Sequence, residues 1–144
     1  MHLRVRSITY LAEGINGYEL VDPRGRDLPR FTAGAHIELR IGGFVRQFSL
    51  TNEAAERRRY CIAVLREDGG RGGSRHFHDH VRVGDLAEVS LPRNNFPVDP
   101  TANRHLLIAG GIGIAPILSM IAELRQRFRS ALLRVLARAY RLPQ

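Results

Sequence analysis

The sequence predicts a mainly β fold, with a small antiparallel barrel first and the beginning of an α/β nucleotide-binding domain after it. Short segments in which apolar and polar residues alternate recur as far as about Leu91, as the strands of a barrel do. A run rich in proline and asparagine follows, at residues 92–104. The pattern then changes to an apolar strand, a glycine-rich turn and a helix, which is the first unit of a parallel sheet.

The strands expected in the barrel are short and closely spaced, and they are separated by glycine and proline turns. We expect them at residues 3–11, 18–22, 36–41, 44–50, 60–67 and 86–91. One short helix is expected among them, from Ser74 through Val81. Phe77 and Val81 are four residues apart, so the same face of this helix carries both side chains and packs against the barrel.

Residues 92–104 are interpreted as a linker between two domains, the first at 1–98 and the second at 104–144. The second begins with the apolar strand HLLIAG and continues through GIGIAP into a helix at residues 117–128. Parallel strands need neighbours and cover on both faces, so a lone βα unit does not complete such a sheet. We therefore expect the second domain to be truncated.

Composition excludes several classes of protein. The 144 residues contain no apolar run that approaches the roughly 18 needed to cross a bilayer and no signal-peptide pattern, so a cytoplasmic protein without a membrane partner is expected. A single cysteine, Cys61, excludes an internal disulfide and a four-cysteine iron–sulfur site in this chain. Its place between Tyr60 and Ile62 in a strand predicts a small core residue.

The net charge of +8 does not by itself indicate nucleic-acid binding. All the basic residues except the histidines are arginines, and six of them lie in the last 20 residues, which contain no acid. Without that tail the charge is about +2. Neither a basic face with interleaved aromatics nor a nucleic-acid-binding motif is visible, so no nucleic-acid partner is expected.

RQFSLTN, residues 46–52, is the first candidate binding stretch. The planar fork of Arg46 suits a phosphate, and Phe48 suits contact with a flat ring. The hydroxyl of Ser49 or Thr51 suits a bond to ring carbonyls or sugar hydroxyls. The alternative is an exposed barrel strand with ordinary polar side chains.

The glycine-rich stretch before the short helix is the second candidate. Gly72 and Gly73 permit positive φ and a close approach of a ligand to backbone N–H groups. Ser74 is expected to be the N-cap of a helix whose amino end attracts anions. An anion there would meet amides, a hydroxyl and Arg71 or Arg75, which favours phosphate binding over the alternative of a flexible linker.

GGIGIAP, residues 110–116, is the third candidate. Between an apolar strand and a helix, its glycines indicate a dinucleotide or close packing against another cofactor, and Pro116 fits the first turn of the helix.

The short helix expected from Ser74 through Val81 carries His76, His78 and His80, of which the first and last share a face. Two histidines without a third ligand make a poor metal site, so no metal is predicted.

These stretches, in this order, resemble the ferredoxin–NADP reductase superfamily, and above all its phthalate dioxygenase reductase branch, which includes the vanillate demethylase reductases. That branch carries R-x-Y-S-L-x-N, then G-G-R-G-G-S before a helix, then P-R-N-x-F and G-G-x-G-I-T-P. This sequence has RQFSLTN, DGGRGGSRHFHD, PRNNFPV and GGIGIAP, and FTAGAHIEL at residues 31–39 is also similar. The resemblance spans about residues 3–125.

The resemblance implies a Greek-key flavin-binding barrel that holds FMN, with FAD as the alternative. The residues that would line the isoalloxazine and ribityl chain are Arg46, Phe48, Ser49 and Thr51. Those that would hold the phosphate are Gly72, Gly73 and Ser74, with Arg46 as the counter-charge. Those that would face the nicotinamide and its pyrophosphate are Gly110, Gly111 and Gly113.

The function implied is that of the reductase component of a Rieske-type aromatic oxygenase or demethylase. Such proteins take a hydride from NAD(P)H onto the flavin and pass single electrons to a 2Fe–2S centre, and so to an oxygenase or ferredoxin partner. No 2Fe–2S cluster is expected in this chain. The alternatives are a flavin-binding module without reductase turnover and a basic partner- or membrane-surface protein, the latter resting on the tail alone.

The sequence departs from the family pattern at three places. Phe48 replaces a tyrosine and Ala115 replaces a threonine. The tail, RFRSALLRVLARAYRLPQ, stands where the family has a strand resembling FEVHYCARSRE. One hypothesis is a shifted reading frame, since suitable GC-rich codons for the tail also encode AFEVHYCVCSREPI. The alternative is a native amphipathic helix with Leu132, Leu136 and Tyr140 on one stripe.

Overall fold

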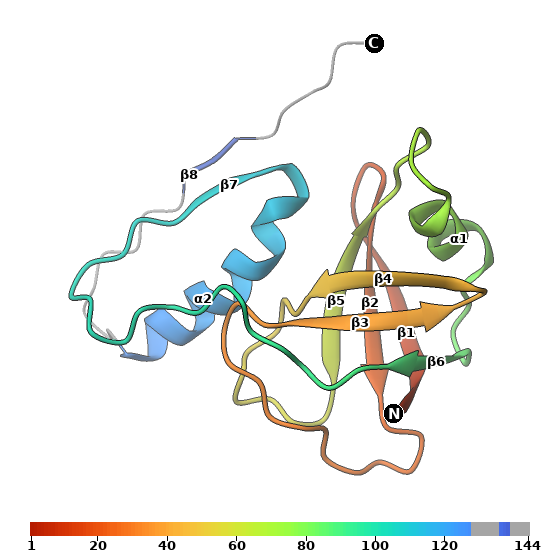
Figure 1. Cartoon of the computed structure of the whole chain (residues 1–144), viewed down its shortest axis with the longest axis horizontal. Helices are drawn as coiled ribbons and strands as arrows, with labels where there is room; N and C mark the ends of the chain where they lie inside the picture. The colour runs from red at the N-terminus through yellow and green to blue at the C-terminus, as the bar shows by residue number, and fades with distance from the viewer. Residues whose placement is uncertain (128–135, 139–144) are drawn as a thin grey trace.

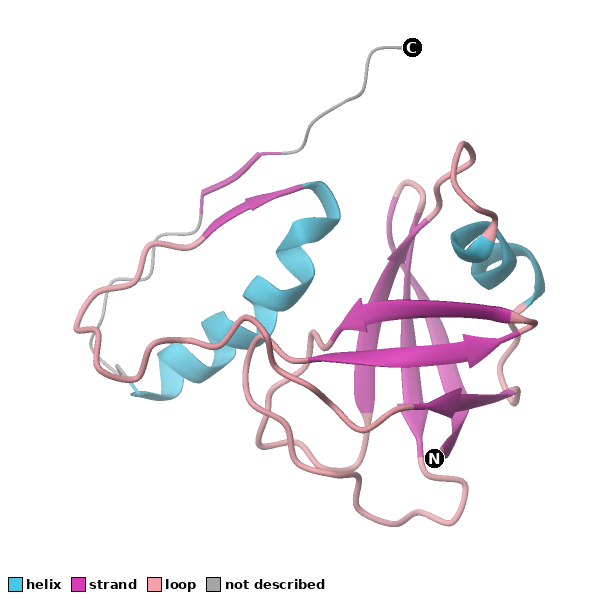
Figure 2. Cartoon of the chain, viewed as in Figure 1, coloured by secondary structure: helices cyan, strands magenta, loops and turns pink. Residues whose placement is uncertain are grey.

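The computed structural model describes residues 1–127 and 136–138, and its larger part is an antiparallel barrel (Figures 1 and 2). The strands form one six-stranded sheet in the order β4-β3-β6-β1-β2-β5. They are β1 (His2–Ala12), β2 (Ile15–Val21), β3 (His36–Ile41), β4 (Phe44–Ser49), β5 (Tyr60–Leu65) and β6 (Leu86–Val89). All six predicted strands are present, because alternation of apolar and polar residues marks strands with one buried face.

The sheet closes into a barrel at a single point. The edge strands meet at an isolated bridge between Leu50 and Ile62, just beyond the end of β4. Away from this bridge β4 and β5 diverge and leave an open seam, which helix α1 (Gly73–His80) covers at one end (Figure 1). The chain passes from β5 through α1 to β6, which lies between β3 and β1. This crossover makes the barrel a Greek key, so the predicted fold class is confirmed.

The barrel core consists of the inward-facing residues of every strand. Its fully buried side chains include Leu3, Val5, Leu20, Ile37, Leu39, Ile62 and Val64. Burial of each such aliphatic side chain stabilises the fold by about 1.5–3 kcal/mol. Phe77 and Val81 of the α1 region join the same cluster, as predicted. The hydroxyl of Tyr18 also donates a hydrogen bond of 2.9 Å to the Phe77 carbonyl, which fixes the helix against β2.

The prediction that Ser74 caps α1 is wrong. The N-cap is Gly72, whose φ of 81° lies in the left-handed region that glycine adopts without strain. The helix begins at Gly73, so Ser74 lies in its first turn. The Ser74 hydroxyl instead accepts a hydrogen bond of 3.0 Å from the Glu67 N–H, which fastens the β5–α1 loop to the helix.

The interpretation of residues 92–104 as a linker is wrong for its first part. His36 and Arg93 exchange two backbone hydrogen bonds, of 2.8 and 3.0 Å. The Asn94 side-chain amide donates to the Thr32 hydroxyl at 2.6 Å and to the Ala33 carbonyl at 2.9 Å. This segment therefore continues the barrel along the start of β3 before the chain leaves it.

The second part of the chain is a βαβ unit. It consists of β7 (Ile108–Gly110), a 3₁₀ turn η1 (Gly111–Gly113), α2 (Ile114–Arg127) and β8 (Leu136–Arg138). β7 and β8 are parallel. The strand expected from residue 105 is shorter than predicted, and the helix starts earlier, with Pro116 in its first turn as expected.

The tail is described only at β8. An amphipathic helix through Leu136 is wrong there, because Leu136 pairs with Ile108 in the sheet. Leu132, Tyr140 and the rest of the stretch on which the reading-frame hypothesis rests lie outside the described residues.

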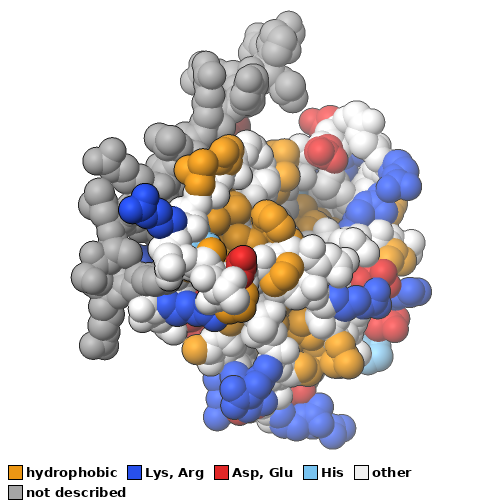
Figure 3. Space-filling view, turned by 60° about the vertical axis from the view of Figure 1, so that its left-hand side comes forward, with side chains coloured by type: hydrophobic (Ala, Val, Ile, Leu, Met, Phe, Trp, Pro, Cys, Tyr) orange, Lys and Arg blue, Asp and Glu red, His pale blue; other side chains and the backbone are white. Residues whose placement is uncertain are grey.

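One face of the βαβ unit exposes apolar side chains. Leu107 and Ala109 pack toward α2, whereas Leu106 and Ile108 are 76% and 74% exposed. A parallel strand needs cover on both faces, and within residues 1–127 this strand has it on one. Apolar side chains also gather in the middle of the face that Figure 3 shows, with arginines around its edge.

No helix in the described part of the chain is long and apolar enough to cross a bilayer.

Gly34 offers a test of how the segment before β3 is packed. Its φ is +90°, and a Cβ there would lie 2.0 Å from the Phe96 carbonyl oxygen. We expect Gly34→Ala to destabilise the protein by about 2–5 kcal/mol, from backbone strain plus overpacking. Urea unfolding followed by circular dichroism measures this change.

Gly25→Ala is the matched control, because Gly25 has a φ of +70° and open space around its Cβ position. It keeps the strain and lacks the clash, so a loss of about 1–2 kcal/mol is expected. Equal losses in both variants would contradict the close packing at Gly34.

Candidate functional site

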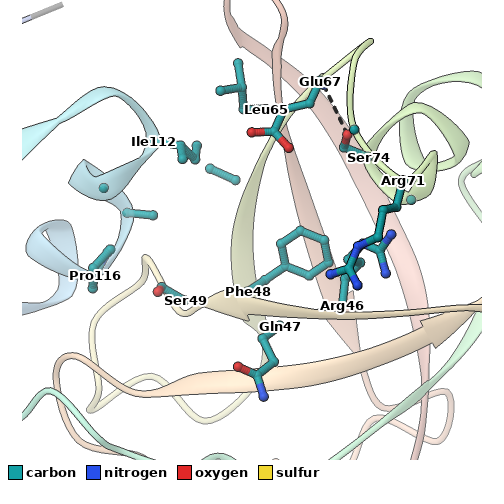
Figure 4. Close-up of a pocket in the computed structure, with 15 residues that line it drawn as sticks. Arg46, Gln47, Phe48, Ser49, Leu65, Glu67, Arg71, Ser74, Ile112 and Pro116 are labelled. Carbon is teal, nitrogen blue, oxygen red and sulfur yellow. Dashed lines mark hydrogen bonds between the residues drawn. The ribbon is translucent and has the colours of Figure 1, made fainter.

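A pocket of about 590 Å³ lies in the open seam of the barrel, between β4, β5, α1 and the start of α2 (Figure 4). This volume is within the range of small-molecule and cofactor sites. Its walls come from four segments of the chain: Arg46, Gln47, Phe48 and Ser49; Ala63, Leu65 and Glu67; Gly70, Arg71, Gly73 and Ser74; and Ile112, Gly113, Ala115 and Pro116.

A cationic end of the pocket forms where β4 meets the amino end of α1. The Arg46 side chain lies directly against the backbone of Gly73, where a Cβ would be only 2.5 Å from the Arg46 Nε. The guanidinium is further held by a 2.7 Å hydrogen bond from Nη1 to the Val45 carbonyl. In Figure 4 the Arg71 guanidinium lies at the same end of the pocket. Neither arginine takes part in an ion pair in the described structure.

The first turn of α1 adds hydrogen-bond donors to this cationic end. The first helical bond runs from the His76 N–H to the Gly72 carbonyl at 2.9 Å. In the described structure the N–H groups of Gly73, Ser74 and Arg75 have no acceptor, and the first turn contains no acid. Because the Ser74 oxygen accepts from Glu67, its own hydrogen remains able to donate. Backbone amides at a positive dipole end, two guanidinium groups and a hydroxyl together suit a phosphate.

The middle of the pocket is apolar. Phe48 and Arg46 project from the same side of β4 towards α1, and Gln47 points the other way (Figure 4). The Phe48 ring meets Phe77 edge to face at 5.0 Å between centroids, so the helix fixes its orientation. On the opposite wall lies Leu65 of β5. The space between these walls suits a flat aromatic group.

The other end of the pocket is formed by Ser49 and by the turn into α2. Figure 4 shows Ser49 on the side of Ile112 and Pro116, away from the two arginines. Ala115 is buried, and Gly113 also lines the wall without a side chain. The pocket therefore runs from a cationic end at α1, which suits a phosphate, to an end at α2 that is lined by one hydroxyl and by apolar residues.

Polar contacts hold α1 on the barrel from its outer side. His78 bonds through Nε2 to the Val64 carbonyl at 2.9 Å, and its Nδ1 lies 3.3 Å from the Asn16 amide nitrogen. Arg66 pairs with Asp79, and this hydrogen-bonded guanidinium lowers the pKa of the Asp79 carboxyl. These contacts hold the carboxyl half of α1, while the bond from the Glu67 N–H to Ser74 holds its amino end, with the free N–H groups, next to Arg46.

The histidines of α1 lie outside the pocket. His76 and His80 stack with ring centroids 4.9 Å apart, on the shared face that their spacing predicts. His76 also packs on Phe44, at 5.2 Å between centroids. Within residues 1–127 and 136–138 no group of three or more metal-ligating side chains gathers.

Most of the predicted binding residues surround the same pocket. The lining includes Arg46, Phe48, Ser49, Gly73, Ser74 and Gly113. Gly72 is adjacent, as the N-cap of α1, and Gly110 and Gly111 lie just before the wall formed by Ile112 and Gly113. Thr51 lies elsewhere: its hydroxyl donates to the Cys61 carbonyl at 3.1 Å, beyond the end of β4.

The wall contributed by β5 was not predicted from the sequence. Tyr60, Ile62 and Val64 face the core, so Ala63 and Leu65 face the other way, into the pocket. The alternation along this strand was available from the sequence. The sequence does not show that β4 and β5 diverge away from the Leu50–Ile62 bridge. This divergence is what makes the outer face of β5 a wall of the pocket.

Known proteins share this arrangement of segments. The chain is 53% identical, over 127 residues, to the reductase subunit of a tert-butanol monooxygenase / tert-amyl alcohol desaturase from Aquincola tertiaricarbonis. It is 48% identical, over 126 residues, to the phthalate dioxygenase reductase of Burkholderia cepacia. The chain belongs to the phthalate dioxygenase reductase branch of the ferredoxin–NADP reductase superfamily. In these two alignments 87–88% of the chain matches 38–39% of the relative.

Solved structures agree with this membership. A phthalate dioxygenase reductase, described as modular and as transferring electrons from pyridine nucleotides to a 2Fe–2S centre, superposes with a TM-score of 0.87 at 48% identity. The match covers 88% of this chain and 40% of that one. The branch is also represented by the vanillate O-demethylase oxidoreductase of Acinetobacter baylyi, 41% identical over 128 residues. A scan of protein-family models returned no match.

Cys61 is not the core residue that was expected. It is half-buried and faces away from the core, on the same side of β5 as Ala63. Burial nevertheless raises the pKa of its thiol to about 11.

We therefore expect Cys61 to remain a neutral thiol and to react slowly with iodoacetamide at pH 8, with the rate rising towards pH 11. The same thiol in guanidinium-unfolded protein should react with its ordinary pKa, near 8.5. Mass spectrometry of the alkylated protein measures both rates. A folded-state rate that levels off by pH 9 would contradict the raised pKa.

Proposed function

We propose that this chain binds FMN in the seam pocket and serves as the flavin part of a reductase that transfers electrons from NAD(P)H. The observation that carries this proposal is the order of chemistry along the pocket. A cationic, donor-rich end is followed by an aromatic middle and then by a wall from a glycine-rich turn. FMN has the same order, with a phosphate, a ribityl chain and a flat ring system.

The cationic end of the pocket suits the phosphate of FMN. A terminal phosphate carries close to two negative charges at neutral pH, and the Arg46 and Arg71 guanidinium groups supply two positive ones at this end. The amides of Gly73 and Ser74 and the Ser74 hydroxyl supply further donors. Gly72, as N-cap, lets the backbone turn so that these amides face the pocket. We propose FMN as the cofactor and keep FAD as the alternative to be tested.

The ring end supports a stacked isoalloxazine. Phe48 offers a fixed aromatic edge, and Leu65 offers an apolar wall opposite. The proposed role of Ser49, which lines this end of the pocket, is to donate to a ring carbonyl. Since the Thr51 hydroxyl already bonds to the Cys61 carbonyl, its proposed role is to hold the corner beyond β4 that ends the pocket.

The donor side is proposed at the turn between β7 and α2. Gly110, Gly111 and Gly113 leave the backbone bare next to the ring end of the pocket, which suits a nicotinamide nucleotide. FMN, when bound, supplies the hydride and single-electron chemistry. The residues of this chain bind its phosphate, orient its rings and cover one side of them.

The partners and substrate follow from the relatives and are proposals. The named relatives are reductases or reductase subunits, among them those of a phthalate dioxygenase and of a tert-butanol monooxygenase. We propose that this chain takes part in the same kind of electron transfer, to an iron–sulfur centre and so to an oxygenase or ferredoxin partner. The alternative is a flavin-binding module without turnover.

The direct test is reconstitution. Purified protein is incubated with FMN or, in a separate sample, with FAD, then desalted and examined by visible absorbance, and NADH or NADPH is then added without oxygen. A flavin spectrum that either nucleotide bleaches supports the reductase. A stable flavin spectrum that neither bleaches supports the module without turnover, and a protein that retains neither FMN nor FAD overturns both.

Arg46→Gln tests the phosphate end. Loss of a charge-assisted hydrogen bond is expected to weaken FMN binding by about 10- to 100-fold, measured by titration of the apoprotein. Riboflavin lacks the phosphate, so its affinity should change by less than about threefold.

Arg40→Gln is the matched control, because Arg40 is an exposed arginine on β3 paired with Glu38 and is not part of the pocket wall. It should leave both affinities unchanged. Equal losses for FMN and riboflavin in the Arg46 variant would contradict a phosphate at this end.

A further inference from the structure

The wall that α2 contributes to the pocket is joined to the barrel by a compact polar junction. The Gly34 N–H donates to the Ser119 hydroxyl at 3.0 Å, and the Ala33 N–H donates to a Glu123 carboxylate oxygen at 3.3 Å. Ser119 and Glu123 are one turn apart on the same face of α2. Ser119 is 0% exposed, so its hydroxyl serves the interior of the protein alone.

A third segment clamps the same turn from the other side. Asn94 donates to the Ala33 carbonyl at 2.9 Å and accepts from the Phe96 N–H at 2.9 Å. The Phe96 carbonyl then lies so close to Gly34 that a Cβ there would be 2.0 Å away. The backbone at Ala33–Gly34 is thus bonded on one side by α2 and closely packed on the other by the segment after β6.

Both walls of the pocket are tied to this junction. On one side, the Ser119 hydroxyl donates to the Pro116 carbonyl at 2.9 Å, and Pro116 lines the pocket. On the other side, β3 begins two residues after Gly34 and pairs along its whole length with β4, which carries Arg46 and Phe48. A shift of α2 at the junction therefore changes the distance between the two walls.

We infer that Ser119 and Glu123 are positioning residues, which set how closely the Ile112–Pro116 wall covers the ring end of the pocket. In the proposed function this wall covers one face of the bound flavin rings and sets the gap that the nicotinamide enters; that consequence rests on FMN binding. The opposing account is that apolar packing of Ala33, Ile117 and Met120 positions the helix and that the two polar groups merely satisfy buried amides.

A distance measurement without ligand decides between these accounts. Spin labels are attached after Arg40→Cys on β3 and Gln126→Cys on α2, both exposed, in a Cys61→Ser background. Pulsed electron spin resonance then gives the distribution of distances between the barrel and the helix. In Ser119→Ala and Glu123→Ala we expect this distribution to widen roughly twofold, whereas Glu123→Gln, which keeps an acceptor oxygen, should restore it.

A second measurement reports the consequence for the cofactor. In FMN-loaded protein, iodide quenching of flavin fluorescence should rise roughly twofold in Ser119→Ala and Glu123→Ala, while FMN affinity changes by less than about threefold. Gln126→Ala, an exposed substitution on the same helix, is the control and should match the unsubstituted protein.

Unchanged distance distributions in both alanine variants, or a Glu123→Gln variant as wide as Glu123→Ala, would overturn the inference. Failure of the unsubstituted protein to bind any flavin would overturn the proposed function, and the distance measurement would still decide the role of the junction.

Discussion

The site depends on the contact between the Arg46 guanidinium and the bare backbone of Gly73. A side chain at residue 73 would place a carbon 2.5 Å from the Arg46 Nε, so glycine is what lets the guanidinium lie against the first turn of α1, and a larger residue would push it aside. At this meeting point the amides of the first turn of α1 and the arginine face the same space. Without it the seam would be a gap between diverging strands, with its cation and its donors apart.

The charges of the chain are arranged in agreement with this contact. Several arginines elsewhere in the described structure pair with acids: Arg59 bonds to Glu56 and Glu19, which raise its pKa, and Arg66 bonds to Asp68 and Asp79. At the pocket, Arg46 and Arg71 have no such partner, and the first turn of α1 contains no acid. Unpaired cations that lie beside free backbone amides favour the binding of an anion at this one site. They do not indicate a broad cationic surface.

The strands of the barrel were predictable from the sequence because each buries one face and so alternates with period two. The glycine stretch was also recognisable, but Ser74 was assigned the position that Gly72 holds, because a glycine in the left-handed region caps a helix without a side-chain bond. The pairing of Arg93 with His36 was missed, since it uses backbone groups and leaves no pattern of residue types. Thr51 was predicted to line the pocket with Ser49, but β4 ends at Ser49 and the chain changes direction there, so the Thr51 hydroxyl bonds to the Cys61 carbonyl instead.

The two parts of the chain, the barrel and the βαβ unit, are packed against each other. Ala33, from the segment before β3, lies in one small apolar cluster with Ile117 and Met120 of α2, and Val98 packs against it. α2 is therefore joined to the segment before β3 by this cluster and also by the hydrogen bonds that Ser119 and Glu123 accept from Gly34 and Ala33, even though β7 has one face uncovered within residues 1–127. The pocket wall formed by Ile112–Pro116 is therefore positioned by the barrel itself, through Ala33 and Gly34. It follows that the geometry of the pocket is set within the barrel part of the fold and its junction with α2, and that any ligand at this end must fit a wall already in place.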